Sequence, residues 1–430
     1  MMTVKVIGAG LAGAEAAYQL AKRGVAVELY EMRPGVSTPV HKGGDIAELV
    51  CSNSLKSTDV GTAQGELKAE LGMLDSAIMR AAYASAVPAG GALAVDRKLF
   101  SAAVEEILKS TNKVTVIRKE VTRIEDNSII ATGPLTSESM GKAISDIIPE
   151  RLYFYDAAAP IITAASIDYD NAFFAARYGK GNADYLNCPM NREEYLAFRE
   201  ALTGAEKVIA KDFEKGELFE GCMPIEELAR RGEDAMRFGP LRPVGIYDRD
   251  NKRAYAVVQL RKEDNYEHLY NIVGFQTNLK FPEQKRVFSM IPALKNAEFV
   301  RYGVMHRNTY IRSPGFLEGD FSVKGRQNLF FAGQITGVEG YLESAASGLI
   351  AGISMAEKLN GGSGILLPET TVIGGLQRYI SEYRGNFQPM HVSFMLLPQI
   401  TGIRDKQARK RAYSERATAD LKKYLQERDI

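Results

Sequence analysis

The clearest pattern of hydrophobic and polar positions lies in the first 35 residues. Residues 3–10, TVKVIGAG, are β-branched and apolar, residues 11–24 form an alanine-rich run that ends in glycine, and residues 25–32 alternate between apolar and polar side chains. An apolar run, a small-residue helical stretch and an alternating segment predict strand, helix and strand in that order. We therefore expect one βαβ unit at the start of the chain.

Strand and helix signals return later in the chain. Residues 126–139, DNSIIATGPLTSES, contain a short apolar strand that is closed by Gly-Pro, and residues 327–359 predict a strand, a glycine-rich turn and a long helix of small residues. The composition between about 170 and 300 is aromatic, charged and irregular instead. This pattern predicts an α/β fold: a Rossmann-like domain from residues 1–170 and 301–430, with an inserted smaller α+β domain at residues 171–300.

Length and composition narrow the class of protein. The chain has 430 residues, 45% hydrophobic and 25% charged, which is ordinary for globular proteins and long enough for two or three structural units. No apolar run approaches the roughly 18 residues of a membrane span, and the N-terminus shows no export signal. We expect a cytoplasmic protein without a membrane partner. The net charge is +1, so any polyanionic partner must be held by local patches.

The first turn carries a dinucleotide-binding fingerprint. Gly8, Ala9, Gly10 and Gly13 fall in the pattern G-x-G-x-x-G between the first strand and helix. Gly8 permits the tight turn, Gly10 leaves room for a pyrophosphate, and Gly13 allows close packing of helix and strand. Glu31 ends the second strand, where an acid can accept hydrogen bonds from a ribose hydroxyl. The glycines alone are a weak signal, but their place in this βαβ unit predicts dinucleotide binding.

A second glycine-rich turn favours FAD over NAD. Residues 333–340 follow a strand and contain Gly333 and Gly340, which we assign to the same cofactor site. Gly133, in ATGP, is typical of the segment that flavoproteins pass beside the nucleotide. No second G-x-G-x-x-G marks a separate nicotinamide domain, so NAD(P)H would have to react in the flavin cleft itself.

Three cysteines and four histidines are widely scattered. Without C-x-x-C spacing they favour neither a disulfide framework nor a zinc site, and we expect no metal. Cys51 has no cysteine partner within five residues, which excludes a local redox pair, and a buried hydrophobic role is the simpler interpretation for it. We assign the same structural role to Cys188.

Cys222 lies in a different setting. Glycine and proline flank it in the sequence FEGCMPIEELARR, which predicts a loop, and arginines at 230, 231 and 237 follow. Nearby cations would favour a reactive thiolate, whereas the three glutamates between residues 220 and 227 would oppose it. From the residues alone, a structural and a nucleophilic role for Cys222 both stay open.

Five segments together resemble one known family. They are VIGAGLAGAEAAYQLAKRGVAVELYEMRP, AELVCSNSLKS, YLNCPMNREEY, FEGCMPIEELARRGEDAMRFGPLRPVG and LFFAGQITGVEGYLESAASGLIAG. The chain resembles, essentially end to end, the folate-dependent, FAD-containing tRNA (uracil-5-)-methyltransferases that modify the T-loop uridine. The motif positions show no departure from that family.

The resemblance implies a reaction and roles for particular residues. Methylenetetrahydrofolate would supply one carbon, reduced FAD would carry it to C5 of the T-loop uridine (uracil 54), and NAD(P)H would restore reduced FAD. Cys222 matches the thiolate that adds to C6 of the uracil, and Cys51 matches a second functional cysteine, at the flavin or as the base that removes the C5 proton. His306 and Tyr341 are candidate substrate-binding residues, each with an ordinary structural role as the alternative.

The implied partner is the T arm of tRNA, whose target base must be flipped out of the folded RNA. Arg230 and Arg237, in the arginine-rich stretch of residues 230–242, are candidate phosphate contacts. The last 27 residues carry nine basic and five acidic side chains in a helix-compatible pattern, which suits either RNA or a solvated surface.

Three other functions remain as alternatives. The related FAD- and folate-using enzymes that modify the wobble uridine share the N-terminal fingerprint, but we expect them to be longer, with an extra helical domain at the C-terminus. A flavoprotein oxidoreductase of small molecules would make the cysteines structural, and a non-catalytic RNA-binding flavoprotein would not need them for activity.

Overall fold

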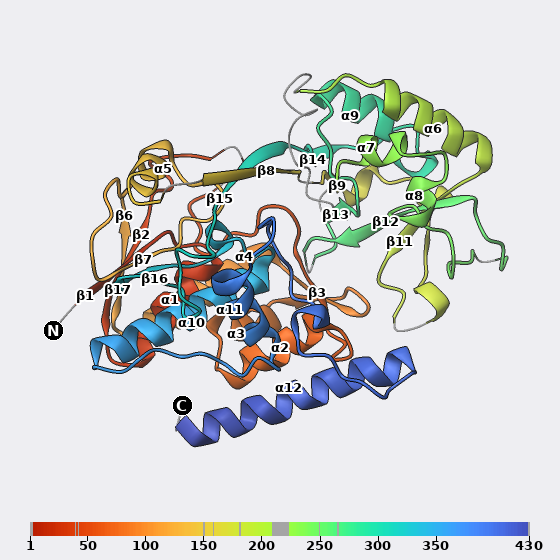
Figure 1. Ribbon diagram of the computed structural model, residues 1–430. Helices are drawn as coiled ribbons and strands as arrows, with labels where there is room; N and C mark the ends of the chain where they lie inside the picture. The colour runs from red at the N-terminus through yellow and green to blue at the C-terminus, as the bar shows by residue number, and fades with distance from the viewer. Residues whose placement is uncertain are drawn as a thin grey trace.

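The computed structural model describes residues 3–38, 40–41, 43–148, 151–157, 159–179, 182–208, 223–248, 250–264 and 266–428, with no account of the side chains of 151–157, 305–307 and 327. The chain forms two bodies (Figure 1). Segments from both ends of the sequence make up the first body, and the middle of the chain makes up the second.

A six-stranded sheet forms the centre of the first body. Its strand order is β16-β17-β7-β1-β2-β6, and all neighbours are parallel except β16 and β17. The bounds are β16 Ser322–Val323, β17 Arg326–Phe331, β7 Ser128–Ile130, β1 Thr3–Ile7, β2 Ala26–Glu31 and β6 Val114–Arg118. The predicted Rossmann-like α/β fold is confirmed, because the late strand β17 pairs with β7 beside the N-terminal βαβ unit.

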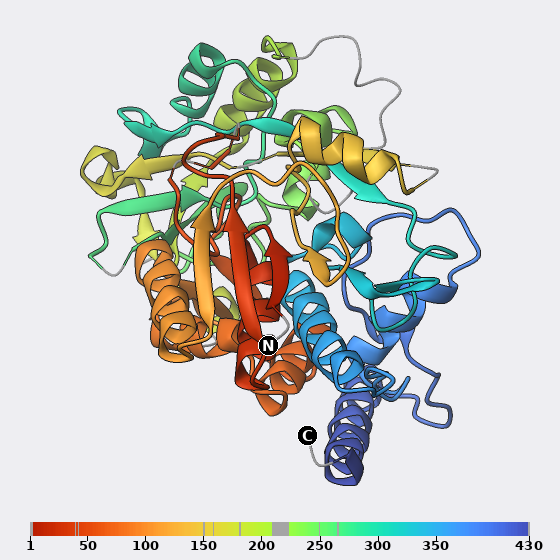
Figure 2. The same cartoon turned by 90° about the vertical axis from the view of Figure 1, so that its left-hand side faces the viewer.

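Helices cover this sheet, and the closest pair joins the two ends of the chain. The helix α1 (Leu11–Lys22) packs on α10 (Tyr341–Leu359). A Cβ added at Gly348 would lie 2.1 Å from the carbonyl oxygen of Ala12, and one at Gly352 would lie 2.7 Å from that of Ala16. Only glycine allows this approach of the two backbones. Figure 2 shows the sheet and its helices from the side.

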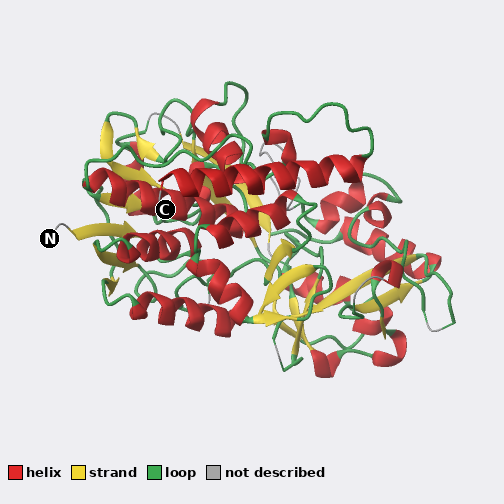
Figure 3. Ribbon diagram, turned by 90° about the horizontal axis from the view of Figure 1, so that it is seen from below, coloured by secondary structure: helices red, strands yellow, loops and turns green. Residues whose placement is uncertain are grey.

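Buried carboxylates of α2 (Ala63–Met73) hold the C-terminal helices in place. Glu70 accepts hydrogen bonds from the backbone nitrogens of Val372 (2.7 Å) and Ile373 (2.9 Å), the first residues of α11 (Val372–Glu382). Glu66 accepts from Ser414 and Thr418 of α12 (Lys406–Arg428), which lies on the outside of this body (Figures 1 and 3). The other helices here are α3 (Ala77–Ala84), α4 (Arg97–Ser110) and α5 (Glu138–Ser145).

The second body is built on an antiparallel sheet with the order β10-β11-β12-β13-β9-β14. Its strands are β9 (Ile161–Thr163), β10 (Phe173–Phe174), β11 (Leu186–Met190), β12 (Ala256–Lys262), β13 (Leu269–Ile272) and β14 (Phe299–Arg301). Its helices are α6 (Arg192–Gly204), α7 (Ile225–Arg230), α8 (Ala235–Phe238) and α9 (Phe281–Phe288). It has a hydrophobic core of its own, as expected for a separate folding unit.

Two strands connect the bodies. The strands β8 (Arg151–Ala157) and β15 (Met305–Ile311) pair with each other, one leading into the second body and one leading out (Figure 1). The strand β9, which starts at residue 161, already belongs to the second sheet. The boundaries at residues 171 and 300 stay a prediction.

A small sheet lies where the bodies meet, made of β3 (Ser54–Ser57), β5 (Ala92–Val95) and β4 (Ala86–Val87).

Within the described ranges, no helix combines the length and the apolar character that crossing a membrane requires.

Candidate functional site

The first glycine-rich turn has the geometry of a phosphate cradle. Gly8 adopts a φ of +102°, and a Cβ there would lie 2.4 Å from the carbonyl oxygen of Ala131, which directly follows the neighbouring strand β7. A Cβ at Gly13 would lie 1.8 Å from the carbonyl oxygen of Gly8. Gly10, at the N-terminus of α1, faces open space instead, with nothing within 4 Å of its added Cβ. The turn is thus closed where the backbone packs and open where a pyrophosphate would meet the helix dipole.

This turn opens into a cavity of about 1000 Å³, part of it exposed to solvent. The stretches that line it include the first turn with Glu31 and Arg33, the ATGP segment with Gly133, and the second turn with Gly333 and Gln334. We call it the cofactor cavity. FAD fits these residues, because both ends of the chain reach the same cavity.

Glu31 lies in the wall of the cofactor cavity, 4% exposed, with its carboxylate already occupied by donors. Oε1 accepts from the backbone nitrogen (3.0 Å) and Nε (2.9 Å) of Arg33, and Oε2 accepts from the nitrogen of Ala9 (3.2 Å) and from Nη2 of Arg33 (3.2 Å). Burial opposes the charge, but the Arg33 contacts lower the pKa of Glu31 below its ordinary value. A ribose hydroxyl would replace one of the 3.2 Å bonds, and that role of Glu31 stays a prediction.

The glycines of the second turn serve two different purposes. Gly333 has a φ of +84°, its nitrogen donates to Oγ of Ser347 at 2.7 Å, and it lines the cofactor cavity. Gly340 has a φ of +122°, and a Cβ there would lie 2.2 Å from the carboxylate of Glu343. The geometry therefore explains Gly340 by packing at the start of α10, and its predicted contact with the cofactor stays a prediction.

Cys51 reaches the wall of the cofactor cavity through its neighbours. Val50 and Tyr341 both line the cavity, and the Tyr341 hydroxyl accepts hydrogen bonds from the backbone nitrogens of Cys51 (2.8 Å) and Ser52 (3.3 Å). Cys51 itself is half-buried. Burial raises the pKa of Tyr341, so its hydroxyl stays protonated at neutral pH. Two candidates from the sequence, Cys51 and Tyr341, are thus in direct contact.

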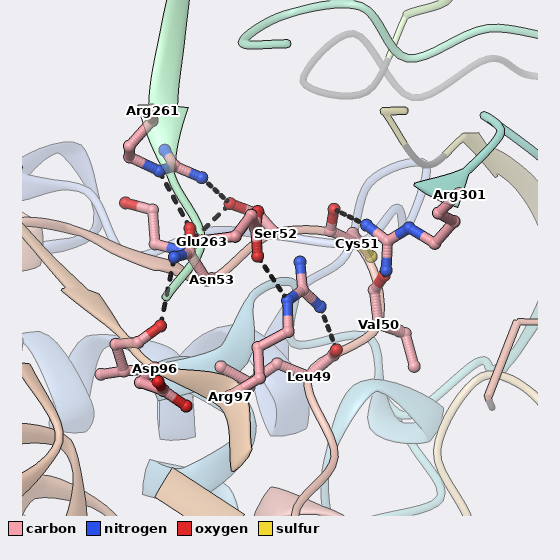
Figure 4. A network of polar contacts seen from close by, with 12 residues as sticks. Leu49, Val50, Cys51, Ser52, Asn53, Asp96, Arg97, Arg261, Glu263 and Arg301 are labelled. Carbon is pink, nitrogen blue, oxygen red and sulfur yellow. Dashed lines mark hydrogen bonds and ion pairs between the residues drawn. The ribbon is translucent and has the colours of Figure 1, made fainter. Parts of the chain in front are cut away.

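Three arginines surround residues 49–53, which we call the cysteine segment (Figure 4). Arg97, at the start of α4, donates to the carbonyl oxygen of Leu49 and pairs with Glu263 at 2.8 Å. Arg261 of β12 donates to Oδ1 of Asn53 (2.9 Å) and Oγ of Ser52 (2.8 Å). Arg301 of β14 donates to the carbonyl oxygens of Val50 (2.9 Å) and Cys51 (3.3 Å). Two of these three arginines come from the second body.

Of the other two cysteines and His306, only Cys188 has a described side chain. Cys188 on β11 is 0% exposed, and burial raises the pKa of its thiol, which agrees with a structural role. Cys222 lies outside the described residues. His306 lies on β15 opposite Asp156, and its side chain is outside the description. Among the described residues, no group of three or more histidine, cysteine, aspartate or glutamate side chains could hold a metal ion.

The two candidate phosphate contacts have partners within the second body. Arg230 donates to the carbonyl oxygen of Thr203 at 2.9 Å, and its side chain is 44% exposed. Arg237 donates to the carbonyl oxygen of Tyr255 at 2.9 Å, lies 3.7 Å from the centre of the Tyr255 ring and pairs with Asp234. Arg230 therefore has the freer surface position, and contact of either residue with RNA stays a prediction.

Sequence reasoning missed the four arginines that organise the site. Arg33 binds Glu31 next to the first turn, and Arg97, Arg261 and Arg301 bind the cysteine segment. Arg33 follows Glu31 by two residues, so the usual position of the ribose-binding acid could have drawn attention to it. The other three act on carbonyl and side-chain oxygens far away in the sequence, and no local pattern marks them.

Comparison with known proteins gives a consistent set of relatives. The profile of the family described as glucose inhibited division protein A matches residues 3–363. The chain is similar to the methylenetetrahydrofolate–tRNA-(uracil-5-)-methyltransferase TrmFO of Bacillus subtilis, with 55% identity over 96% of this chain and 97% of the relative. The same enzyme of Natranaerobius thermophilus is 53% identical, over 99% of both chains.

Solved structures agree on the fold. The GidA protein of Aquifex aeolicus superimposes with a TM-score of 0.72, covering 98% of this chain and 73% of that protein, at 16% identity. At that identity the likeness concerns the fold alone. It shows that the arrangement of both bodies recurs in a distant relative.

Proposed function

The chain belongs to the glucose inhibited division protein A family and, within it, to the methylenetetrahydrofolate–tRNA-(uracil-5-)-methyltransferases, and we propose that it methylates C5 of the T-loop uridine of tRNA. The enzyme takes the carbon from methylenetetrahydrofolate and uses FAD as its cofactor. The observation that carries the proposal is the cofactor cavity, which both ends of the chain line and which has the cysteine segment at its wall.

The residues of the chain prepare the cavity for the cofactor. The open space at Gly10 and the N-terminus of α1 would hold the pyrophosphate, and Glu31 with Arg33 would bind the ribose. When bound, reduced FAD supplies the one-carbon and hydride chemistry that produces a methyl group. NAD(P)H is the proposed reductant, and it would reach the cofactor through the open side of the same cavity.

The uracil ring requires a nucleophile and a base from the protein. Carbon C5 of uracil is a poor nucleophile until a thiolate adds at C6 and turns the ring into an enolate. We assign that thiolate to Cys222, which follows from the family resemblance. A base must then remove the C5 proton so that the thiolate can leave, and we assign this step to Cys51. The position of the cysteine segment beside Tyr341 at the cavity wall supports this assignment.

Transfer RNA must present its phosphates to basic side chains on the outside. Arg230 and the cationic positions of α12 are the proposed contacts, and His306 is proposed to contact a substrate ring. Binding through phosphates weakens steeply with salt, so a flat affinity between low and moderate salt would remove these contacts from the proposal. We also place the reaction in the cytoplasm, where thiols stay reduced.

The direct test is the transfer of labelled carbon from methylenetetrahydrofolate into T-loop uridine of unmodified tRNA, with NAD(P)H present. Wild type should transfer label and Cys222→Ala should not, while both retain flavin absorbance. The matched control is Cys188→Ala, because Cys188 lies in the core of the second body and should lose stability without losing the reaction. Label from both cysteine variants would dismiss Cys222 as the nucleophile, and no label from wild type would contradict the function.

A further inference from the structure

The peptide of Cys51 is held from both sides. Its backbone nitrogen donates to the Tyr341 hydroxyl at 2.8 Å, and its carbonyl oxygen accepts from Nη2 of Arg301 at 3.3 Å. Nη1 of Arg301 also donates to the carbonyl oxygen of Val50 at 2.9 Å. Tyr341 lies in the first body, at the start of α10, whereas Arg301 ends the strand β14 of the second body. Cys51 therefore depends on both bodies for its position.

More than one residue of the second body contacts the cysteine segment. Arg301 reaches a third carbonyl oxygen, that of Ala159 at 3.5 Å, in the segment that enters the second sheet. Arg261 binds Ser52 and Asn53, and Nδ2 of Asn53 donates back to the carbonyl oxygen of Lys262 at 3.0 Å. Figure 4 shows these side chains converging on the cysteine segment from different elements. The antiparallel sheet thus contacts the segment whose Val50 lines the cofactor cavity.

The same arginines surround Cys51 with positive charge. Burial, followed by the neighbouring charge of Arg97, lowers the pKa of Arg301 to about 10, while the carboxylate of Glu263 acts in the opposite direction, as would a negative charge on Tyr341 or Cys51. Burial likewise opposes the charge of Arg97, but the pair with Glu263 raises its pKa, with smaller contributions from Tyr341 and Cys51. Because electrostatic interaction is mutual, both guanidinium groups favour a negative charge on Cys51.

Two donors in this cluster lack an acceptor. Within the described residues, Nε of Arg301 and Nη2 of Arg97 are buried without a hydrogen-bond partner, and so is the acceptor Oε1 of Glu263, which pairs with Arg97 through Oε2. A buried donor that stays unsatisfied is destabilising, and the penalty is larger for charged groups. Glu263 is the carboxylate of this cluster, and its pair with Arg97 leaves Arg301 without a carboxylate contact among the interactions described above. A thiolate at Cys51 would provide negative charge where these donors lack it.

We propose that Arg301 is a positioning residue for Cys51: it fixes the Cys51 peptide at the wall of the cofactor cavity and stabilises the sulfur as a thiolate, ready to accept a proton. The use of this thiolate as the base for C5 rests on the proposed function. The state of the thiol does not, and it can be measured without tRNA or folate. Among the described residues, the charged and titratable groups that face Cys51 include Arg97, Arg301 and Tyr341, with Glu263 behind Arg97.

The test is the rate of Cys51 alkylation by iodoacetamide as a function of pH in the flavin-loaded, full-length enzyme. Mass spectrometry of the Cys51 peptide separates this thiol from the other two. Removing one nearby cation changes a pKa by about one unit, so Arg301→Met should move the midpoint of the alkylation profile upward by that amount. Arg301→Lys keeps a positive charge near neutral pH and should shift the midpoint less than Arg301→Met does.

The matched control is another arginine of the second body that donates to main-chain carbonyl oxygens, away from Cys51. Arg177 donates to the carbonyl oxygens of Val244 and Arg242 and to Oε1 of Gln259, all within the second body. Arg177→Met should leave the Cys51 midpoint unchanged. If Arg301→Met does not fold, Arg301→Gln provides a neutral side chain that retains an amide donor for one carbonyl oxygen, and the same shift is expected.

Turnover separates this proposal from the proposed function. If wild type transfers labelled carbon, Arg301→Lys should lower kcat about tenfold with KM for folate unchanged, because an ammonium lacks the planar fork with which the guanidinium reaches three carbonyl oxygens. An unchanged alkylation midpoint in both neutral variants would overturn the thiolate claim, and so would an equal shift in Arg177→Met. A shifted midpoint in an enzyme that transfers no carbon would uphold the positioning of the thiol while contradicting the methyltransferase.

Discussion

The parallel sheet of the first body and the antiparallel sheet of the second contribute to the site in different ways. In the parallel sheet, strands β1, β2, β7 and β17 end at one edge, and the turns that follow them line the cofactor cavity. The antiparallel sheet has no such common edge, since neighbouring strands end on opposite sides. It contributes side chains instead, Arg261 from β12 and Arg301 from β14.

This difference divides the functional residues into two classes. Residues of the parallel sheet act through the shape of the backbone, so a single added methyl group is enough to change the cavity. Residues of the antiparallel sheet act through long side chains on the cysteine segment, so their loss should spare the cavity and impair the chemistry. The second body is also expected to meet the RNA, so tRNA binding and thiol position would be linked through one sheet.

The largest effect is expected for Gly13→Ala, which disrupts the packing of α1 against the parallel sheet. The new Cβ would lie 1.8 Å from the carbonyl oxygen of Gly8, so the helix must move away from the strand. We expect the free energy of unfolding to fall by about 3 kcal/mol, as for overpacked cores, and the purified variant to contain little flavin. Thermal unfolding and the ratio of flavin to protein absorbance measure both. Wild-type flavin content would contradict this geometry.

Gly10→Ala sharpens the comparison, because it should spare the fold and affect the cofactor. Its added Cβ has nothing within 4 Å, yet it would occupy the position where the backbone meets the pyrophosphate. Loss of one charge-assisted hydrogen bond, about 1.5–3 kcal/mol, should weaken FAD binding roughly 10- to 100-fold. The control is Gly72→Ala in α2, which also has open space around it and should leave FAD affinity unchanged. Equal affinities in both variants would contradict the assignment of the cavity.

Arg261→Met probes the antiparallel sheet. The variant loses the bonds to Ser52 and Asn53, and displacement of the cysteine segment should reduce carbon transfer about tenfold without loss of flavin. Arg286→Met is the control, since Arg286 is an exposed residue of the same body whose partner is Glu283 on its own helix. The measurement is the initial rate of label transfer per bound flavin. A rate equal to that of the control would remove Arg261 from the positioning of Cys51.

A smaller effect concerns how the C-terminal helices dock on the first body. Burial raises the pKa of Glu70 from its ordinary value of 4.5 to about 8. The folded state therefore binds this proton more tightly than the unfolded state, and the stability from Glu70 is greatest below pH 4.5 and is lost as the pH rises toward 8. Between pH 5 and pH 8, wild type should lose roughly a few degrees of thermal midpoint relative to Glu70→Gln, which does not titrate. Thermal midpoints that change equally with pH in the two proteins would contradict this.

The sequence predicted the parts of the site that depend on local backbone conformation. Gly8, Gly10 and Gly13 lie within six residues, so the backbone conformation of their turn can be predicted from local sequence. Gly333 belongs to a second glycine-rich turn near the other end of the chain. That segment was assigned to the same cofactor because it is a second glycine-rich turn that follows a strand. Gly340 shows the limit, because packing against Glu343 already explains its glycine, and its contact with the cofactor stays a prediction.

The arginines of the cysteine segment could not be predicted in this way. Arg301 and Val50 are 251 positions apart in the sequence, and an arginine that donates to main-chain carbonyl oxygens leaves no pattern at either end. The same holds for Arg261 and Asn53, which are 208 positions apart. Such contacts depend on how the two bodies meet, and only the folded chain shows this.

The division of labour between the two sheets can be tested most directly by measuring carbon transfer against added FAD in Gly10→Ala and Arg301→Met side by side. We predict that excess FAD restores transfer to Gly10→Ala, because its defect is cofactor affinity. Transfer by Arg301→Met should stay below wild type at every FAD concentration, because its cavity is already filled. Rescue of both variants by FAD, or of neither, would contradict the account.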